Sequence, residues 1–130
     1  LPVAYFEKGD PYHCHCAKTA RLLKEKLGMK DDNFKLTFQS RFGPTKWLEP
    51  YTEATLRELG EAGHKNIAVI TPGFISDCVE TLEEIAIEAR ETFIDAGGEN
   101  FTTIPCLNSS PESIKLLAQL AHVELAGWVA

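Results

Sequence analysis

From residue 66 the chain reads Asn-Ile-Ala-Val-Ile-Thr-Pro-Gly-Phe-Ile-Ser-Asp-Cys-Val-Glu-Thr-Leu-Glu-Glu-Ile-Ala-Ile-Glu-Ala-Arg-Glu, ending at Glu91. The first six residues form an apolar run, which predicts a parallel strand buried on both faces. Pro72-Gly73-Phe74 is typical of the turn that ends such a strand. The residues from Asp77 onward predict a helix that stops at Gly97-Gly98. A strand, a turn and a helix in this order are the repeating unit of an α/β sheet.

The same alternation continues on both sides of this stretch. Before it, we expect an irregular lead-in over residues 1–12, then a helix to about residue 27 that is capped by Asp10 and Gly28, and then an alternating strand over 34–39. A further helix is expected from Thr52 to near Gly63. After this stretch, we expect a strand over 101–104 and a last helix over about 112–124 with its apolar positions inside. This order predicts an α/β fold, a three-layer Rossmann-like domain with a mostly parallel sheet and helices on both faces. We expect one domain over residues 1–130.

Charge and composition exclude several classes of protein. The net charge is −6 and no basic block occurs, so nucleic-acid binding is not expected. No apolar run is long enough to cross a membrane, and the residues at the start of this sequence do not have the pattern expected of a signal peptide. The four cysteines are too irregularly spaced for a disulfide framework, which favours reduced thiols and a cytoplasmic protein. The chain begins with Leu1 and looks like a piece of a longer protein.

Three carboxylates share one row of the predicted helix. Glu80, Glu84 and Glu88 are each four residues apart, and like charges at this spacing cost roughly 0.2–0.5 kcal/mol per pair. A solvated acidic face is the ordinary explanation of such a row. The alternative is a path for a divalent cation, because divalent cations prefer oxygen ligands.

Two loops leave the carboxyl ends of predicted strands, where ligands bind in such sheets. One covers residues 40–48 and the other residues 71–74. Their notable side chains are three aromatics, a hydroxyl and a cation: Phe42, Trp47, Phe74, Ser40 and Arg41. An apolar wall with a few polar groups suits a flat organic ligand that carries charge.

Several motifs in colinear order closely resemble those of the ferrochelatases, enzymes that insert Fe²⁺ into a porphyrin to make haem. They are Gly9-Asp10-Pro11-Tyr12, Phe38-Gln39-Ser40-Arg41-Phe42-Gly43-Pro44 with Trp47-Leu48, Pro72-Gly73-Phe74 followed by Ser76-Asp77 and Glu80-Thr81-Leu82, and Leu107-Asn108. The resemblance covers nearly the whole chain and points to the C-terminal half of a bacterial enzyme.

The resemblance implies two Rossmann-like domains with the porphyrin cleft between them. The partner of this chain is then the N-terminal domain of the same enzyme, absent from these residues. The family's catalytic histidine precedes a Leu-Pro such as Leu1-Pro2, and none of His13, His15, His64 and His122 matches its position. The implied function is insertion of Fe²⁺ into protoporphyrin IX, with this fragment inactive alone.

Site residues follow from the same resemblance. Glu80 corresponds to the active-site glutamate, a metal ligand or proton acceptor, and Asp77 falls in the same catalytic motif. Glu84 and Glu88 match an acidic row that guides metal or protons along a π-type helix. Burial and the neighbouring carboxylates are expected to raise the pKa of Glu80.

The implied porphyrin pocket contains five residues: Tyr12, Ser40, Trp47, Phe74 and Cys78. Cys78 stands where some relatives carry a histidine, so the role of that second histidine stays open. Fe²⁺ is expected as a substrate, and no cofactor is firmly predicted. A [2Fe–2S] cluster through Cys14 and Cys16 is disfavoured, because their spacing fits helical geometry poorly and no further cysteine set accompanies them.

Two other functions remain open. One is a chelatase for another metal or tetrapyrrole, including coproporphyrin. The other is a non-catalytic ligand-binding module of the same fold, although a binder has no need for a row of uncompensated carboxylates. Membrane contact is expected to be peripheral at most, since no basic amphipathic helix is apparent.

Overall fold

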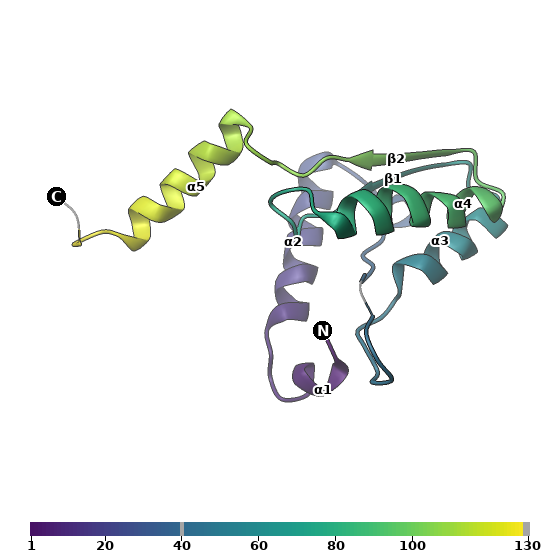
Figure 1. Ribbon diagram of the computed structural model, residues 1–130, viewed down its shortest axis with the longest axis horizontal. Coiled ribbons are helices and arrows are strands. Elements are labelled where there is room, and N and C mark those ends of the chain that lie inside the picture. Colours follow the sequence, from purple (N-terminus) through teal and green to yellow (C-terminus); the bar gives the residue numbers. More distant parts are fainter. Residues whose placement is uncertain (40, 129–130) are drawn as a thin grey trace.

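The fold is α/β and is seen in a computed structural model that describes residues 1–39 and 41–128. Its elements in chain order are α1 (Val3–Phe6), α2 (Tyr12–Leu27), the short 3₁₀ helix η1 (Asp31–Asn33), α3 (Thr52–Glu61), β1 (Asn66–Ile70), the π-helix η2 (Glu80–Ala89), α4 (Arg90–Asp95), β2 (Asn100–Ile104) and α5 (Pro111–Glu124). Figure 1 shows β1 and β2 side by side, with η2, α4 and α3 beneath them. Among the described residues no helix is long and apolar enough to cross a bilayer.

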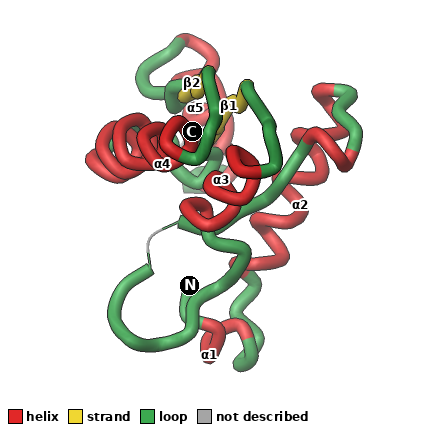
Figure 2. Tube along the Cα trace, turned by 90° about the vertical axis from the view of Figure 1, so that its right-hand side faces the viewer, coloured by secondary structure: helices red, strands yellow, loops and turns green. Residues whose placement is uncertain are grey.

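The sheet consists of β1 and β2, which pair in parallel with Asn66 opposite Asn100 and Ile70 opposite Ile104. Its inner face is half-buried over the helices, whereas Ile70 and Ile104 on the outer face are 41% and 40% exposed. The prediction that β1 is buried on both faces is therefore wrong. The reason is that α5 extends away from the strands (Figure 1) and α2 lies to one side of them (Figure 2). The helix layer that the sequence predicts on the outer face of the sheet stays a prediction.

The core lies between the sheet, α3 and the long helix formed by η2 and α4. Leu56, Ala89 and Phe93 form its centre, and Ile67 and Phe101 from the strands pack against them. Phe93 is fully buried. The side chains of Thr81, Ile85, Ala89 and Phe93 are all buried at a spacing of four residues, which makes them the inner row of this helix. The acidic row is displaced from it by one residue.

The capping contacts that the sequence predicted at the two ends of α2 are present. Asp10 Oδ1 accepts a hydrogen bond from the backbone N–H of Tyr12 (2.9 Å) at the start of α2. Gly28 ends α2 in the left-handed conformation, with φ 65°. Ser110 caps α5 by accepting from the N–H of Ser113 (3.2 Å). These local hydrogen bonds involve residues close in sequence, which is why the sequence reveals them.

Three expectations about the periphery are wrong. Residues 1–12 include the helical turn α1, and residues 34–39 form no sheet strand, because Phe38 makes only an isolated bridge with Tyr51. An alternating segment becomes a strand only where a partner strand lies beside it. The apolar residues of α5 are not inside, since Ile114, Leu117 and Leu120 are 54%, 42% and 55% exposed. Figure 1 shows the cause: α5 extends away from the sheet.

Candidate functional site

The candidate site begins where β1 ends and η2 starts, and Asp77 is its most connected residue. Its Oδ2 accepts from Asn108 Nδ2 (2.7 Å), and its Oδ1 accepts from the Thr81 hydroxyl (3.2 Å) and from the N–H of Cys106 (3.2 Å). Hydrogen bonding, first of all from Asn108, lowers the pKa of the Asp77 carboxyl. Asp77 is thus held as an ionised acceptor that joins the end of β2 to the start of η2.

Cys78 and Glu80 form a pair beside Asp77. The Cys78 thiol donates to Glu80 Oε2 (2.9 Å), and the N–H of Cys78 donates to the Thr81 hydroxyl (3.0 Å). The thiol hydrogen bond lowers the pKa of the Glu80 carboxyl. The prediction of a raised pKa is therefore wrong for this chain. The physical reason is that Glu80 is only half-buried, so hydrogen bonding outweighs desolvation.

Glu84 follows Glu80 along η2 and binds a residue from far away in the sequence. Gln39 Nε2 donates to Glu84 Oε2 (2.9 Å). Glu88 lies further along the same helix and is exposed. Within the ranges that the structure describes, no three His, Cys, Asp or Glu side chains converge as a metal site would require, at the acidic row or at Cys14 and Cys16.

Trp47 belongs to a second part of the predicted site, the loop that follows Gln39. Its indole Nε1 donates to the carbonyl of Phe42 (2.9 Å), and Trp47 forms an antiparallel bridge with Pro2. The N–H of Leu48 donates to the carbonyl of Leu1 (3.0 Å). The chain entering at Leu1 is therefore fixed against this loop. Phe42, at the opposite extreme, is 85% exposed.

The remaining predicted pocket residues occupy different places. Tyr12 is at the start of α2 and is 46% exposed, and partial burial raises the pKa of its phenol. Phe74 is half-buried in the turn after β1. Ser40 lies outside the described residues. The predicted pocket residues therefore come from separate segments: the start of α2, the loop that contains Trp47 and the turn after β1.

Gln39 connects the two parts of the site. Its side chain binds Glu84, and its neighbour Phe38 stacks on the ring of His13 in α2, with 5.7 Å between ring centroids. The sequence analysis included Gln39 in an alternating segment and in a family motif and assigned it no role of its own. Asn108 was likewise quoted only within a motif. The residue type of Asn108 is the feature of the sequence that could have indicated its role, because asparagine tolerates the left-handed conformation that Asn108 adopts here (φ 50°).

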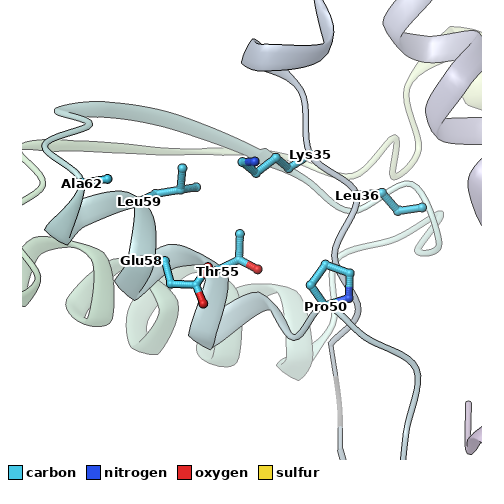
Figure 3. A pocket seen from close by; sticks show the side chains of 7 residues that line it. All are labelled: Lys35, Leu36, Pro50, Thr55, Glu58, Leu59 and Ala62. Carbon is cyan, nitrogen blue, oxygen red and sulfur yellow. The ribbon is translucent and has the colours of Figure 1, made fainter.

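A hollow among the described residues lies away from these side chains. It has a volume of about 410 Å³ and is lined by Lys35, Leu36, Pro50, Thr55, Glu58, Leu59 and Ala62. Figure 3 shows these side chains, which come from the segment before the loop, from Pro50 and from one side of α3. None of the predicted site residues lines it.

Comparison with known proteins gives a consistent result. The ferrochelatase family model matches residues 1–125. A ferrochelatase of Agrobacterium fabrum and one of Rhizobium meliloti are each 60% identical to this chain over 129 residues, 99% of the chain. A ferrochelatase of Brucella ovis is 53% identical over the same share. The chain spans 38% of the length of the first two relatives and 37% of the third.

Proposed function

Because the chain belongs to the ferrochelatase family, we propose that it is the C-terminal part of an enzyme that inserts Fe²⁺ into protoporphyrin IX in haem biosynthesis. The observation that carries the proposal is the ten-residue π-helix η2, which begins at Glu80. π-Helical turns are rare and occur frequently at functional sites. Here the helix contains the acidic row that a cation or proton path requires.

The π geometry gives the carboxylates a common direction. In an α-helix a residue four positions on lies roughly 40° further around the axis, so a row at this spacing spirals away. A helix with i→i+5 hydrogen bonds has more residues per turn and reduces that drift. Glu80 and Glu84 are both half-buried next to the inner row, and Glu88 is exposed. The row thus leads from the site toward solvent.

The proposed reaction replaces two pyrrole protons of the macrocycle with Fe²⁺. Glu80 receives the metal or a proton, with its carboxyl kept ionised by the Cys78 thiol. Glu84 and Glu88 pass protons outward. Asp77 contributes by holding the start of η2, since its oxygens are engaged by Asn108, Thr81 and Cys106. A depressed pKa favours Glu80 as a cation ligand over a strong base.

The porphyrin is proposed to lie against the aromatic residues of the two loops. Tyr12, Ser40, Trp47, Phe74 and Cys78 form the part of the pocket that this chain supplies. We propose that the N-terminal domain of the same enzyme supplies the other wall. Support comes from the bridge between Pro2 and Trp47. The family motif has its catalytic histidine before a Leu-Pro such as Leu1-Pro2, and the bridge puts Pro2 next to Trp47.

The test is Fe²⁺ insertion by the full-length enzyme that contains this chain, with protoporphyrin and coproporphyrin as substrates and the fragment assayed in parallel. Glu80→Gln should lower kcat about 10²–10⁴-fold while porphyrin binding, measured by fluorescence quenching, persists. Glu83→Gln is the matched control, because Glu83 is an exposed carboxylate on the same helix. Normal turnover by Glu80→Gln would refute the assignment of Glu80. Turnover by the fragment alone would refute the division of the site between two domains.

A chelatase for another metal or tetrapyrrole is the second candidate, favoured by the thiol at Cys78, a soft ligand next to Glu80. A panel of divalent metals with both porphyrins separates it from haem synthesis. We place the enzyme in the bacterial cytoplasm, with membrane contact at most peripheral. The four cysteines support this location because each is a free thiol.

A further inference from the structure

We propose that Asn108 is a positioning residue that, with Asp77, fixes the first turn of η2 and thereby the place of the Glu80 carboxylate. The proposal rests on the function proposed above. Asn108 Oδ1 accepts from the backbone N–H of Asp77 (2.9 Å), and Asn108 Nδ2 donates to Asp77 Oδ2 (2.7 Å). Two hydrogen bonds between the same two residues define both their separation and their relative orientation.

The segment around Asn108 is built to hold this geometry. Asn108 has φ 50°, a left-handed conformation that costs energy for most residues. Its backbone N–H donates to the carbonyl of Ile75 (2.8 Å), and its Nδ2 also donates to the carbonyl of Cys106 (3.0 Å). The residues that follow β2 are thereby attached to those that precede η2. A strained conformation persists where surrounding contacts hold it in place.

Asp77 transmits this attachment to the helix. Its Oδ1 accepts from the hydroxyl of Thr81 (3.2 Å), which is buried (3% exposed) and heads the inner row. Phe93, at the other end of that row, is fully buried. Its ring lies so close to Gly98 that a Cβ there would be 2.2 Å from Cε1 of Phe93. Both ends of the row are therefore fixed.

The two fixed positions, Thr81 and Phe93, explain why η2 has more residues per turn than an α-helix. Phe93 follows Thr81 by twelve residues, which in an α-helix is about 3.3 turns and would place the two side chains roughly 120° apart. Keeping both on the inner side requires about four residues per turn, and i→i+5 hydrogen bonding over Glu80–Ala89 provides the extra width. Releasing Thr81 from Asp77 lets the first turn relax toward α-helix. Glu80, the preceding residue, then moves with it.

An exchange of the two side chains tests the pairing in the full-length enzyme. Asn108→Asp places two carboxylates together. Asp77→Asn leaves one side-chain oxygen where Asp77 uses both as acceptors, so each single variant loses part of the match of donor and acceptor. The double variant restores one amide and one carboxylate. A small displacement at a reacting group can lower the rate about 10²-fold, so we expect a fall in kcat of about 10–100-fold in each single variant. The KM for porphyrin should hold, and the double variant should recover most of the loss.

Asn100→Ala is the matched control. It removes a side-chain amide hydrogen bond at the start of β1 and β2, the opposite end of the strands from Asp77 and Asn108, where Asn100 Nδ2 donates to Asn66 Oδ1 (2.7 Å). Activity should not change. Hydrogen exchange of the backbone amides of residues 80–86 supplies a readout independent of turnover. Exchange should accelerate in the single variants and return in the double variant.

The outcomes distinguish the two proposals. A wild-type enzyme that does not insert Fe²⁺ refutes the proposed function, and the exchange rates still decide the role of Asn108. Wild-type kcat and exchange in Asn108→Asp refute the positioning role. A double variant no better than the single variants also refutes it, because Asp77 would then act through its own charge.

Discussion

Replacing Gly98 by alanine is predicted to destabilise the protein by about 1–3 kcal/mol, the usual cost of overpacking a core. An added Cβ would lie 2.2 Å from Cε1 of Phe93, 2.4 Å from Cδ1 and 2.5 Å from Cζ. Carbon atoms in contact are normally about 3.5–4.0 Å apart. The ring cannot move aside freely, because it is fully buried and packs against Leu56 and Phe101.

A double-mutant cycle isolates this contact. Phe93→Ala alone should cost about 3–5 kcal/mol. With the ring removed, alanine at position 98 meets no such clash, so the double variant should be at least about 1 kcal/mol more stable than the sum of the two single changes predicts. The assay is urea unfolding of the full-length enzyme, followed by circular dichroism. Additive effects would refute the steric argument.

Gly73→Ala serves as the control for this cycle. An added Cβ at Gly73 would meet no atom within 4 Å. The free energy of unfolding should therefore change by less than about 0.5 kcal/mol. If neither Gly98→Ala nor Gly73→Ala changes the free energy of unfolding, then Phe93 is packed less tightly than its distances indicate.

Two further predictions concern acid stability and helix capping. The folded state lowers the pKa of Asp77, so its stabilisation is present above the unfolded pKa of about 3.9 and is lost as the pH falls through the folded value. Asp77→Asn should therefore flatten the decline of the unfolding midpoint in acid, and parallel pH curves would contradict this. Ser110→Ala should cost about 0.5–2 kcal/mol, because α5 loses the cap on Ser113. Ser109→Ala, at an exposed neighbour without a described capping bond, is the comparison in thermal unfolding, and equal losses would argue against the cap.

Long-range contacts decided several features that local patterns could not predict. The alternating pattern of residues 34–39 is genuine, but without a partner strand beside it the segment forms only the bridge between Phe38 and Tyr51. The hydrogen bond from Gln39 to Glu84 joins residues 45 positions apart. The pKa of Glu80 is lowered rather than raised, because the orientation of the Cys78 thiol and the half-exposure of Glu80 are tertiary properties.

The sequence by itself determined the α/β class, the parallel strands that became β1 and β2, the helix that follows β1 and the capping residues Asp10 and Gly28 of α2. These features depend on hydrophobic periodicity and on hydrogen bonds between near neighbours, which the order of residues encodes directly. Its motifs also identified the family. Only the tertiary structure decided which faces are covered and how the acidic row is presented. In our proposal the width of η2 depends on anchors at Thr81 and Phe93. Thr81 binds Asp77, which Asn108 holds in turn, and Phe93 lies against Gly98, so both anchors depend on residues beyond the helix in sequence.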